Sequence, residues 1–295
     1  MEVIYTIEAI RNRLEELKLS HGVNNRIGFV PTMGFLHDGH ASLLTKAKEE
    51  CAIVVLSIYV NPLQFGPKED FTTYPKDTER DLACASAAGV DIVFMPDSRE
   101  MYPQATRTKV HVAELTTPLC GASRPGHFDG VATVVTKLLN IVNPERVYMG
   151  IKDAQQVAVV EQMVADLNMR VEVVICPTLR ESDGLAMSSR NVYLQPEERK
   201  QAVVLSQALE QATLWWTHMQ ENEQGASQLE LRIRELIAAA PLAQIDYVQV
   251  VTYPSLQKVK SQQIDGGDQQ ILVALAVKFG HTRLIDNRIL ALRRS

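Results

Sequence analysis

Residues 27–40 read IGFVPTMGFLHDGH, and this stretch decides the fold class. It opens with a short apolar strand pattern over residues 27–30, which Pro31 ends. A turn follows, and a helical pattern then runs from about residue 40 to residue 50. A strand that leads directly into a helix is the repeating element of folds built on a parallel sheet.

The alternation of strands and helices continues to about residue 176. Apolar strand patterns cover residues 51–60, 91–95, 146–149 and 171–175, and helical patterns cover residues 7–17, 77–88, 131–142 and 154–167. Strands as apolar as these are typical of a parallel sheet that is buried on both faces. We therefore expect an α/β domain over residues 1–178.

The pattern changes after residue 178. Helices are predicted at residues 196–219 and 226–240 with a polar loop at 220–225, and strands at 245–251 and 270–279 with a turn at 265–268. Helices followed by strands, without alternation, favour a smaller α+β domain over residues 179–295.

Composition narrows the class of function. The 295 residues contain 30 Lys and Arg against 35 Asp and Glu, for a net charge of −5. This balance argues against a general nucleic-acid binder but allows a small anionic substrate. The four cysteines form no CxxC pair, so we expect neither a disulfide framework nor structural zinc.

No apolar run reaches the roughly 18 residues of a membrane span, and the first residues lack the pattern of a secretory signal. We expect a cytoplasmic protein that does not contact membranes.

A first candidate site lies in residues 31–40, where a strand gives way to a helix. Ligands of open parallel sheets bind beyond the carboxyl ends of the strands, and the N-terminus of a helix favours a phosphate. His37 and His40 are three residues apart, so both imidazoles could donate hydrogen bonds to phosphate oxygens. A plain turn with two surface histidines and a metal-binding pair are the alternatives.

A second candidate lies in residues 187–191, Met-Ser-Ser-Arg-Asn. The hydroxyls of Ser188 and Ser189 and the guanidinium of Arg190 suit phosphate oxygens. An ordinary polar loop is the alternative. This loop lies at the predicted domain junction. Its location favours the interpretation that it closes over a bound nucleotide.

A third candidate, residues 150–156, follows a predicted strand and opens a helix. It is therefore expected at the same sheet edge as residues 31–40. Lys152 is a candidate phosphate partner, and Gln156 is a neutral hydrogen-bond donor. Asp153 is a candidate for ribose hydroxyls or, equally, a helix N-cap.

Uncharged polar residues follow the strand at residues 51–60. Asn61 and Gln64 would fit the hydroxyls or carboxylate of a small polar substrate, and a simple turn is the alternative. The acidic stretch over residues 69–81 is expected to be mostly solvated, but one carboxylate could hold Mg²⁺ together with substrate phosphates.

Together these clusters resemble the pantothenate synthetases, the AMP-forming pantoate–β-alanine ligases. The resemblance runs nearly end to end through PTMGFLHDGH (31–40), YVNPLQFGPKEDFTTYP (59–75), RPGHFDGVATVVTKLLNIV (124–142), GIKDAQQ (150–156), DGLAMSSRNVYL (183–194) and TRLIDN (282–287). HDGH and MSSRN look like the two nucleotide signatures of the nucleotidyltransferases and class I aminoacyl-tRNA synthetases.

The resemblance implies a Rossmann-like N-terminal domain, a smaller C-terminal domain, a homodimer and Mg²⁺ bound with ATP. It also implies a pantoyl-adenylate intermediate, from which β-alanine displaces AMP.

The resemblance also assigns roles to residues. The triphosphate and transition-state contacts would be His37, His40, Lys152, Ser188, Ser189 and Arg190. The ribose contacts would be Gly150 and Asp153, with backbone near Met187. The pantoate pocket would include Met33, Gln64 and Gln156, with Met33 also bordering ATP and Asn61 near the route of the amine.

Three departures from the commonest family pattern are Ile151, Lys76 and Arg80. Arg80 precedes Asp81 where an acid can stand, which leaves Asp81 alone as a candidate Mg²⁺ ligand. None of the three replaces a residue expected in the chemistry. The competing hypotheses are a related nucleotidyltransferase that acts on another acid or phosphate, a silent nucleotide-binding protein, and an RNA-binding role, which the acidic balance disfavours.

Overall fold

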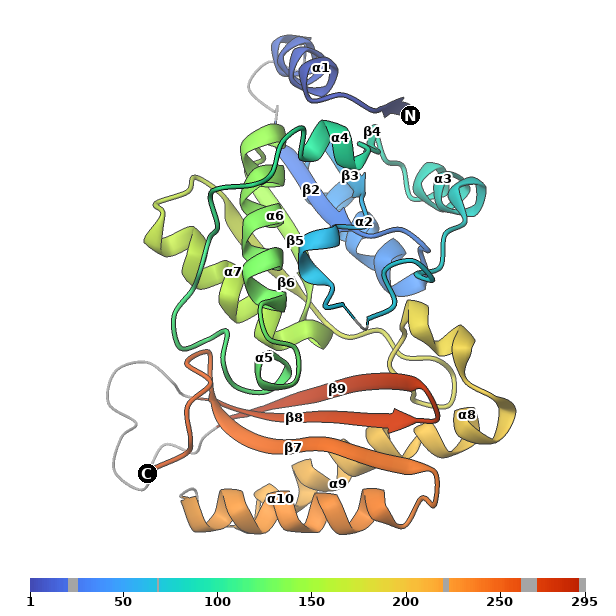
Figure 1. Cartoon of the computed structure of the whole chain (residues 1–295), viewed down its shortest axis with the longest axis vertical. Helices are drawn as coiled ribbons and strands as arrows, with labels where there is room; N and C mark the ends of the chain where they lie inside the picture. Colours follow the sequence, from blue (N-terminus) through green and yellow to red (C-terminus); the bar gives the residue numbers. More distant parts are fainter. Residues whose placement is uncertain (21–25, 68, 220–222, 261–269, 292–295) are drawn as a thin grey trace. The chain divides into compact units, whose positions relative to one another are not determined.

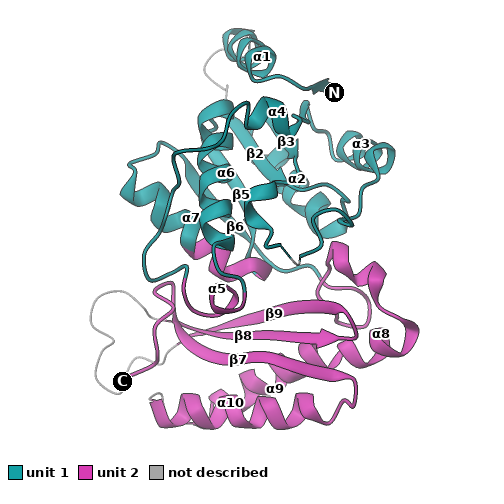
Figure 2. Cartoon of the chain, in the orientation of Figure 1, with its two compact units in different colours: residues 1–116, 124–151, 159–179 teal, residues 117–123, 152–158, 180–295 magenta. Residues whose placement is uncertain are grey.

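The computed structural model describes residues 1–20, 26–67, 69–219, 223–260 and 270–291. It forms two compact units, which are coloured separately in Figure 2. The first unit comprises residues 1–116, 124–151 and 159–179, and the second comprises residues 117–123, 152–158 and 180–295. The sequence suggested a single division after residue 178. In the structure two short earlier segments, residues 117–123 and 152–158, also belong to the second unit.

A six-stranded sheet forms the centre of the first unit, in the order β1-β4-β3-β2-β5-β6. Its strands are β1 (Glu2–Ile4), β2 (Ile27–Thr32), β3 (Ile53–Ile58), β4 (Ile92–Phe94), β5 (Arg146–Gly150) and β6 (Glu172–Cys176). Every neighbouring pair is parallel. The expected α/β class is therefore confirmed, and β1, three residues long, is the strand that periodicity could not predict.

Helices lie around this sheet (Figure 1). They are α1 (Ile7–Ser20), α2 (Asp38–Glu50), α3 (Thr78–Ala87), α4 (Ser98–Met101), α6 (His127–Val142) and α7 (Ala154–Asp166). Val30 on β2 packs in one apolar cluster with residues of α2 and α3. Its neighbour Phe29 points to the other face and is also fully buried, and α6 contacts β2. Both faces of the sheet are thus covered, as apolar strands require.

The strand order reverses beside β2. From β2 the chain continues to β3 and β4 on one side, and it later returns through β5 and β6 on the other. The carboxyl ends of β2 and β5 flank this switch point, where open α/β sheets bind ligands. The turn that begins at Met33 follows β2, and Gly150 ends β5, so both lie at the expected edge.

The second unit contains a three-stranded antiparallel sheet in the order β7-β8-β9. Its elements are α5 (Cys120–Ser123), α8 (Pro196–Ala202), α9 (Val204–Trp216), α10 (Glu223–Ala238), β7 (Ala243–Tyr253), β8 (Gln270–Phe279) and β9 (Thr282–Ala291). This is the smaller α+β domain that the sequence predicted.

Details differ from the sequence prediction in this unit. The single helix expected over residues 196–219 is two helices, which divide at Val203. The loop expected over residues 220–225 is wrong for residues 223–225, which begin α10, while residues 220–222 and the turn at 265–268 lie outside the described residues. Strand β9 was missed, because its buried centre holds polar residues where alternation would place apolar ones.

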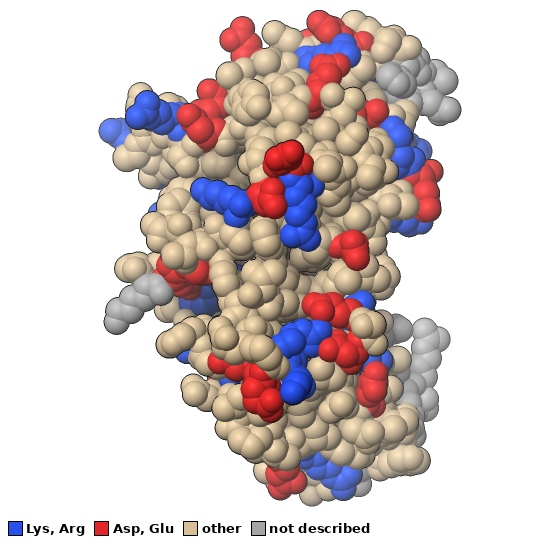
Figure 3. Space-filling view, turned by 90° about the vertical axis from the view of Figure 1, so that its right-hand side faces the viewer, with Lys and Arg blue, Asp and Glu red and all other residues tan. Residues whose placement is uncertain are grey.

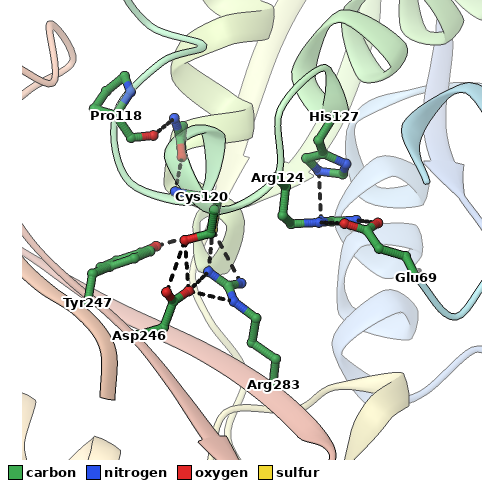
Figure 4. A network of polar contacts seen from close by, with 10 residues as sticks. Glu69, Pro118, Cys120, Arg124, His127, Asp246, Tyr247 and Arg283 are labelled. Atoms are coloured by element: carbon green, nitrogen blue, oxygen red, sulfur yellow. Dashed lines mark hydrogen bonds and ion pairs between the residues drawn. The ribbon is translucent and has the colours of Figure 1, made fainter. Parts of the chain in front are cut away.

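The two faces of this sheet have different partners. Leu275 and Val277 of β8 belong to the apolar cluster that includes residues of α9 and α10. The opposite face carries Tyr247 and Arg283, both of which reach the thiol of Cys120 in the segment 117–123 (Figure 4). The short segments inserted from earlier in the chain therefore pack on the face that the helices leave uncovered.

Among the described residues, no helix is both long enough and apolar enough to cross a membrane. On the face drawn in Figure 3, basic and acidic side chains are interspersed across a mostly uncharged surface.

Candidate active site

The turn after β2 has a backbone that few residues can adopt. Gly34 has φ of 83° and Phe35 has φ of 51°, so two consecutive residues are left-handed. A Cβ on Gly34 would lie 2.9 Å from the carboxylate of Asp81. That carboxylate accepts hydrogen bonds from the amides of Phe35 (2.8 Å) and Leu36 (2.6 Å). Asp81 thus holds the turn in the shape that delivers the chain to the start of α2.

Asp81 is buried, with 2% of its surface exposed. Burial raises the pKa of its carboxyl above the ordinary value, and the two amide hydrogen bonds oppose this only in part. Both described contacts hold its oxygens to backbone. Asp81 as a Mg²⁺ ligand remains a prediction, while its observed contacts describe an anchor for the turn.

The two histidines form a reciprocal cap at the N-terminus of α2. His37 is the N-cap residue, and its Nδ1 accepts from the amide of Gly39 at 3.1 Å. The Nδ1 of His40 accepts in turn from the amide of His37 at 3.3 Å. The ring centroids lie 4.0 Å apart. Because both Nδ1 atoms are acceptors, this pattern assigns the proton of each neutral ring to Nε2, which becomes a donor.

Polar side chains after β3 form a second part of the site. Asn61 caps the short 3₁₀ turn η1 (Pro62–Gln64) and is buried. Its Nδ2 donates to the side-chain oxygen of Gln64 at 3.2 Å and to the carbonyl of Gly130 at 3.1 Å. The amide nitrogen of Gln64 lies 3.2 Å from the sulfur of Met33. Residues expected near pantoate, namely Met33, Asn61 and Gln64, are therefore contiguous in the first unit.

The backbone of Gln64 is fixed from the start of α6. The Nδ1–H of His127 donates to the Gln64 carbonyl at 2.7 Å, and Arg124 donates to the Nε2 of His127 at 3.0 Å. Arg124 also forms an ion pair with Glu69, with the shorter contact at 2.5 Å (Figure 4). Burial would raise the pKa of Glu69, but the hydrogen bonds and charge of Arg124 outweigh it and lower the pKa below its ordinary value.

Close backbone packing brings α6 and η1 together. A Cβ on Gly130 would lie 2.7 Å from the Cα of Gln64 and would collide with the carbonyl of Leu63. Only glycine permits this approach. Sequence reasoning assigned no role to Gly130, Arg124 or His127 and placed Glu69 only in an acidic stretch of which one carboxylate could hold Mg²⁺, although all four lie in motifs that carry the resemblance.

The remaining candidates belong to the second unit, apart from Gly150 at the end of β5. A Cβ on Gly150 would meet no described atom within 4 Å, which is compatible with a ligand close to its backbone. Lys152 and Asp153 lie in the 3₁₀ turn η2 (Ile151–Asp153), and Gln156 lies on α7, half-buried. The ammonium of Lys152 has no ion-pair partner among the described residues. The carbonyl of Lys152 accepts from Nδ2 of Asn287 at 2.7 Å.

The loop that carries residues 187–190 is a braced hairpin. Arg180 and Ala186 form an antiparallel bridge, and the Glu181 amide donates to the Leu185 carbonyl at 2.8 Å. Asn191 donates to the carboxylate of Glu181 at 2.7 Å and to the Ala186 carbonyl at 3.1 Å. The hairpin and the residues after it are therefore tied into one piece.

Within this loop the nucleotide candidates lie at the start of a 3₁₀ turn, η3 (Ser189–Tyr193). The hydroxyl of Ser188 caps the turn by accepting from the Arg190 amide at 3.2 Å. Ser189 is buried, and Met187 and Arg190 are half-buried. The second unit thus carries Lys152, Asp153, Gln156, Met187, Ser188, Ser189 and Arg190, and the first carries Met33, His37, His40, Asn61, Gln64, Asp81 and Gly150.

Comparison with known proteins identifies the family of this chain. A family model described as pantoate-beta-alanine ligase matches residues 2–289. The chain belongs to the pantoate-beta-alanine ligase family. A pantothenate synthetase of Pelotomaculum thermopropionicum is 54% identical over 290 residues, which is 98% of this chain and 99% of that protein. One of Acetivibrio thermocellus is 53% identical over 98% of this chain and 99% of its own length.

Solved structures of the family have the same fold. The pantothenate synthetase of Thermus thermophilus is 43% identical and superposes with a TM-score of 0.86 over 98% of this chain and 99% of that one. The pantoate-beta-alanine ligase of Francisella tularensis, 33% identical, has a TM-score of 0.77 over 98% of this chain and 97% of its own. The latter was solved in complex with beta-gamma ATP and beta-alanine. Family membership confirms the ligase activity and the fold that the sequence predicted.

Proposed function

We propose that this member of the pantoate-beta-alanine ligase family uses the residues described above to join pantoate to β-alanine through a pantoyl adenylate. His37, His40, Lys152, Ser188, Ser189 and Arg190 contact the triphosphate and its transition state. Gly150, Asp153 and the backbone at Met187 contact the ribose. Gln64 and Gln156 bind pantoate, Met33 borders both ligands, and Asn61 lies near the route of the amine.

The observation that carries this assignment is the reciprocal cap of His37 and His40. Both Nδ1 atoms accept backbone hydrogen bonds, which leaves Nε2 as the donor of each neutral ring. Two such donors at the N-terminus of a helix add to its dipole, and together they favour a phosphate. A general base would need a nitrogen lone pair toward the substrate, so the geometry favours hydrogen-bond donation.

The first step needs charge neutralisation more than proton transfer. The carboxylate of pantoate, with an ordinary pKa near 4, is already ionised at about pH 7. It attacks the α-phosphorus of ATP, and the bond to pyrophosphate breaks. Lys152 and Arg190 reduce the repulsion between the two anions, and the imidazole donors stabilise the charge that grows on phosphate oxygens.

The second step releases AMP. The amine of β-alanine attacks the acyl carbon of the adenylate, the bond from that carbon to the phosphate oxygen breaks, and the amine loses a proton. Bulk water, a histidine and the departing phosphate are the candidate acceptors. Because a mixed anhydride hydrolyses in water, a site that closes during the reaction would protect it, and the loop of residues 187–190 is the candidate for this role.

The proposal includes Mg²⁺ bound with ATP. No group of three or more His, Cys, Asp or Glu residues among the described residues could hold a metal. Mg²⁺ is commonly bound through substrate phosphates and only one or two carboxylates. In this proposal the ion enters with the nucleotide and, when bound, supplies positive charge against the phosphate oxygens.

A homodimer, which rests on the resemblance to the family, and a cytoplasmic location, which rests on the sequence features described above, complete the proposal. Sedimentation equilibrium of the purified chain tests the first. A monomer at all concentrations up to those of the assay would contradict it.

Exchange of labelled pyrophosphate into ATP tests the proposed chemistry. With pantoate and Mg²⁺ but without β-alanine, we expect exchange, because a reversible adenylate returns pyrophosphate to ATP. Exchange that is absent in protein shown to bind ATP, both without and with β-alanine, would contradict the adenylate mechanism. Exchange that survives Gln64→Ala at low pantoate would contradict the proposed pantoate pocket.

A further inference from the structure

Two adjacent residues in the middle of β9, Asp286 and Asn287, are polar and buried. Asp286 exposes 2% of its surface and Asn287 exposes 8%. Burial of polar groups is costly unless their hydrogen bonds are made. Both lie in the motif TRLIDN at residues 282–287, to which neither the sequence nor the proposed mechanism gives a role.

The two side chains point to opposite faces of the sheet, because neighbouring residues in a strand alternate. Asp286 is paired with Leu275 of β8, which packs with the helix-covered face. Asn287 is paired with Ala274, so it points to the other face, on which the segment 152–158 packs. These two neighbouring residues of β9 thus face two different segments of the second unit.

Asn287 holds the backbone that carries Lys152. Its Nδ2 donates to the carbonyl of Lys152 at 2.7 Å, a short bond for an amide donor. The Asn287 amide donates to the carboxylate of Asp286 at 2.8 Å, which ties the two residues together. This bond ties the backbone of Lys152 to β9.

Asp286 holds the hairpin that leads to residues 187–190. Its two oxygens accept from the two terminal nitrogens of Arg180 at 2.6 and 3.0 Å, which is the bidentate geometry that best fixes orientation. Arg180 also donates to the carbonyl of Gly184 at 3.1 Å, inside the same hairpin. Strand β9 also contacts η3, which begins at Ser189.

We propose that Asp286 and Asn287 are positioning residues for ATP: together they set the spacing between Lys152 and the loop of Ser188, Ser189 and Arg190. This inference rests on the proposed roles of those residues as phosphate contacts. The phosphates of one nucleotide need cations at fixed separations, and a shared anchor on one strand meets this need. In this role both act through the residues that they hold and not by contact with ATP.

A double-mutant cycle on the full chain tests the role of Asn287. We expect Asn287→Ala to raise the Kd for Mg-ATP about 10-fold, since small misplacements of a binding group are costly. In a Lys152→Ala background the same change should raise the Kd less than about 2-fold, because the group that Asn287 positions is gone. A second cycle pairs Asp286→Asn with Arg190→Ala and has the same expected form.

The matched control is Asp246→Asn. Asp246 forms an ion pair with Arg283 at 2.8 Å on the same sheet, but its partners do not include residues expected to contact ATP. Its loss should leave the Kd for Mg-ATP unchanged while lowering the melting temperature. This separates a loss of position from a general loosening of the sheet.

The outcomes are distinguishable. Folded Asn287→Ala protein with wild-type affinity for Mg-ATP, or with the same loss in both backgrounds, would overturn the positioning role alone. Lys152→Ala protein with wild-type affinity would overturn the proposed phosphate contact and the inference that rests on it. If Asp286→Asn fails to fold because the half-buried Arg180 is left without its partner, the cycle with Asn287 still decides the proposal.

Discussion

Replacement of Gly130 by alanine would test whether the proposed pantoate pocket depends on how closely α6 approaches η1. The new Cβ would stand 2.7 Å from the Cα of Gln64, where carbon atoms normally lie about 3.5–4.0 Å apart. The two backbones must therefore separate by roughly 1 Å. Because the Leu63 carbonyl is in the way as well, a side-chain rotation cannot relieve the clash.

The clash should affect both the stability of the protein and its action on pantoate. Alanine is the better helix former by about 1 kcal/mol, while overpacking costs about 1–3 kcal/mol, so the protein should fold with a small loss of stability. Misplacement of a positioned group by about 1 Å can cost about 100-fold in rate. We therefore expect kcat/KM for pantoate to fall by roughly two orders of magnitude in Gly130→Ala.

Steady-state kinetics with pantoate and ATP varied in turn, together with thermal melting, measure these effects. The change should appear in kcat/KM for pantoate, while the Kd for ATP stays within about 3-fold of wild type because the His37 and His40 cap is built elsewhere. Asn140→Ala is the matched control, since Asn140 is an exposed residue of the same helix whose amide donates to the Thr136 carbonyl. A folded Gly130→Ala protein with wild-type kcat/KM for pantoate would refute this account of the pocket.

Three further changes test separate parts of the first unit. His40→Ala should lower kcat roughly 10²–10³-fold at saturating substrate, as expected for loss of a donor to the transition state, and an unchanged kcat would remove His40 from the chemistry. Asp81→Asn should lower the free energy of unfolding by about 1–3 kcal/mol in urea denaturation, because one of the two amides at Phe35 and Leu36 loses its acceptor, and equal stability would contradict the anchoring role. Glu69→Gln should lower the free energy of unfolding by about 1 kcal/mol at neutral pH. Arg124 lowers the pKa of Glu69, so the difference in stability between the variant and wild type should have its full size above the ordinary pKa near 4.3. It should disappear as the pH falls through the lowered pKa, because Glu69 is then protonated. A difference in stability that persists in acid would contradict the ion pair.

The parallel sheet was predictable because its strands are apolar runs and its turns contain proline and glycine. The candidate site at the ends of β2 and β5 followed from the rule that ligands bind beyond the carboxyl ends of strands. The resemblance implied roles for single residues, and the reciprocal cap of His37 and His40 supports the roles proposed for these two histidines.

The features that could not be predicted depend on contacts distant in sequence. Strand β9 was missed because the burial of Asp286 is compensated by Arg180, which lies 106 residues earlier. The closeness of Gly130 to Gln64 and the ion pair of Arg124 with Glu69 likewise join residues that no local pattern connects. Hydrophobic periodicity predicts that buried positions are apolar. It therefore does not detect a strand whose buried positions hold polar groups with hydrogen-bond partners.

The two short segments that the second unit takes from earlier in the chain limit how this protein can be divided. A fragment beginning at Arg180 would keep the helices of its sheet but lose residues 117–123 and 152–158 from the other face. Tyr247, Arg283 and Asn287 would then lose the Cys120 and Lys152 ends of the bonds described above. This half of the molecule is therefore not an exchangeable module: recombination at a single point near residue 180 would separate residues that must be inherited together, and both parents of a working chimaera must match on this face.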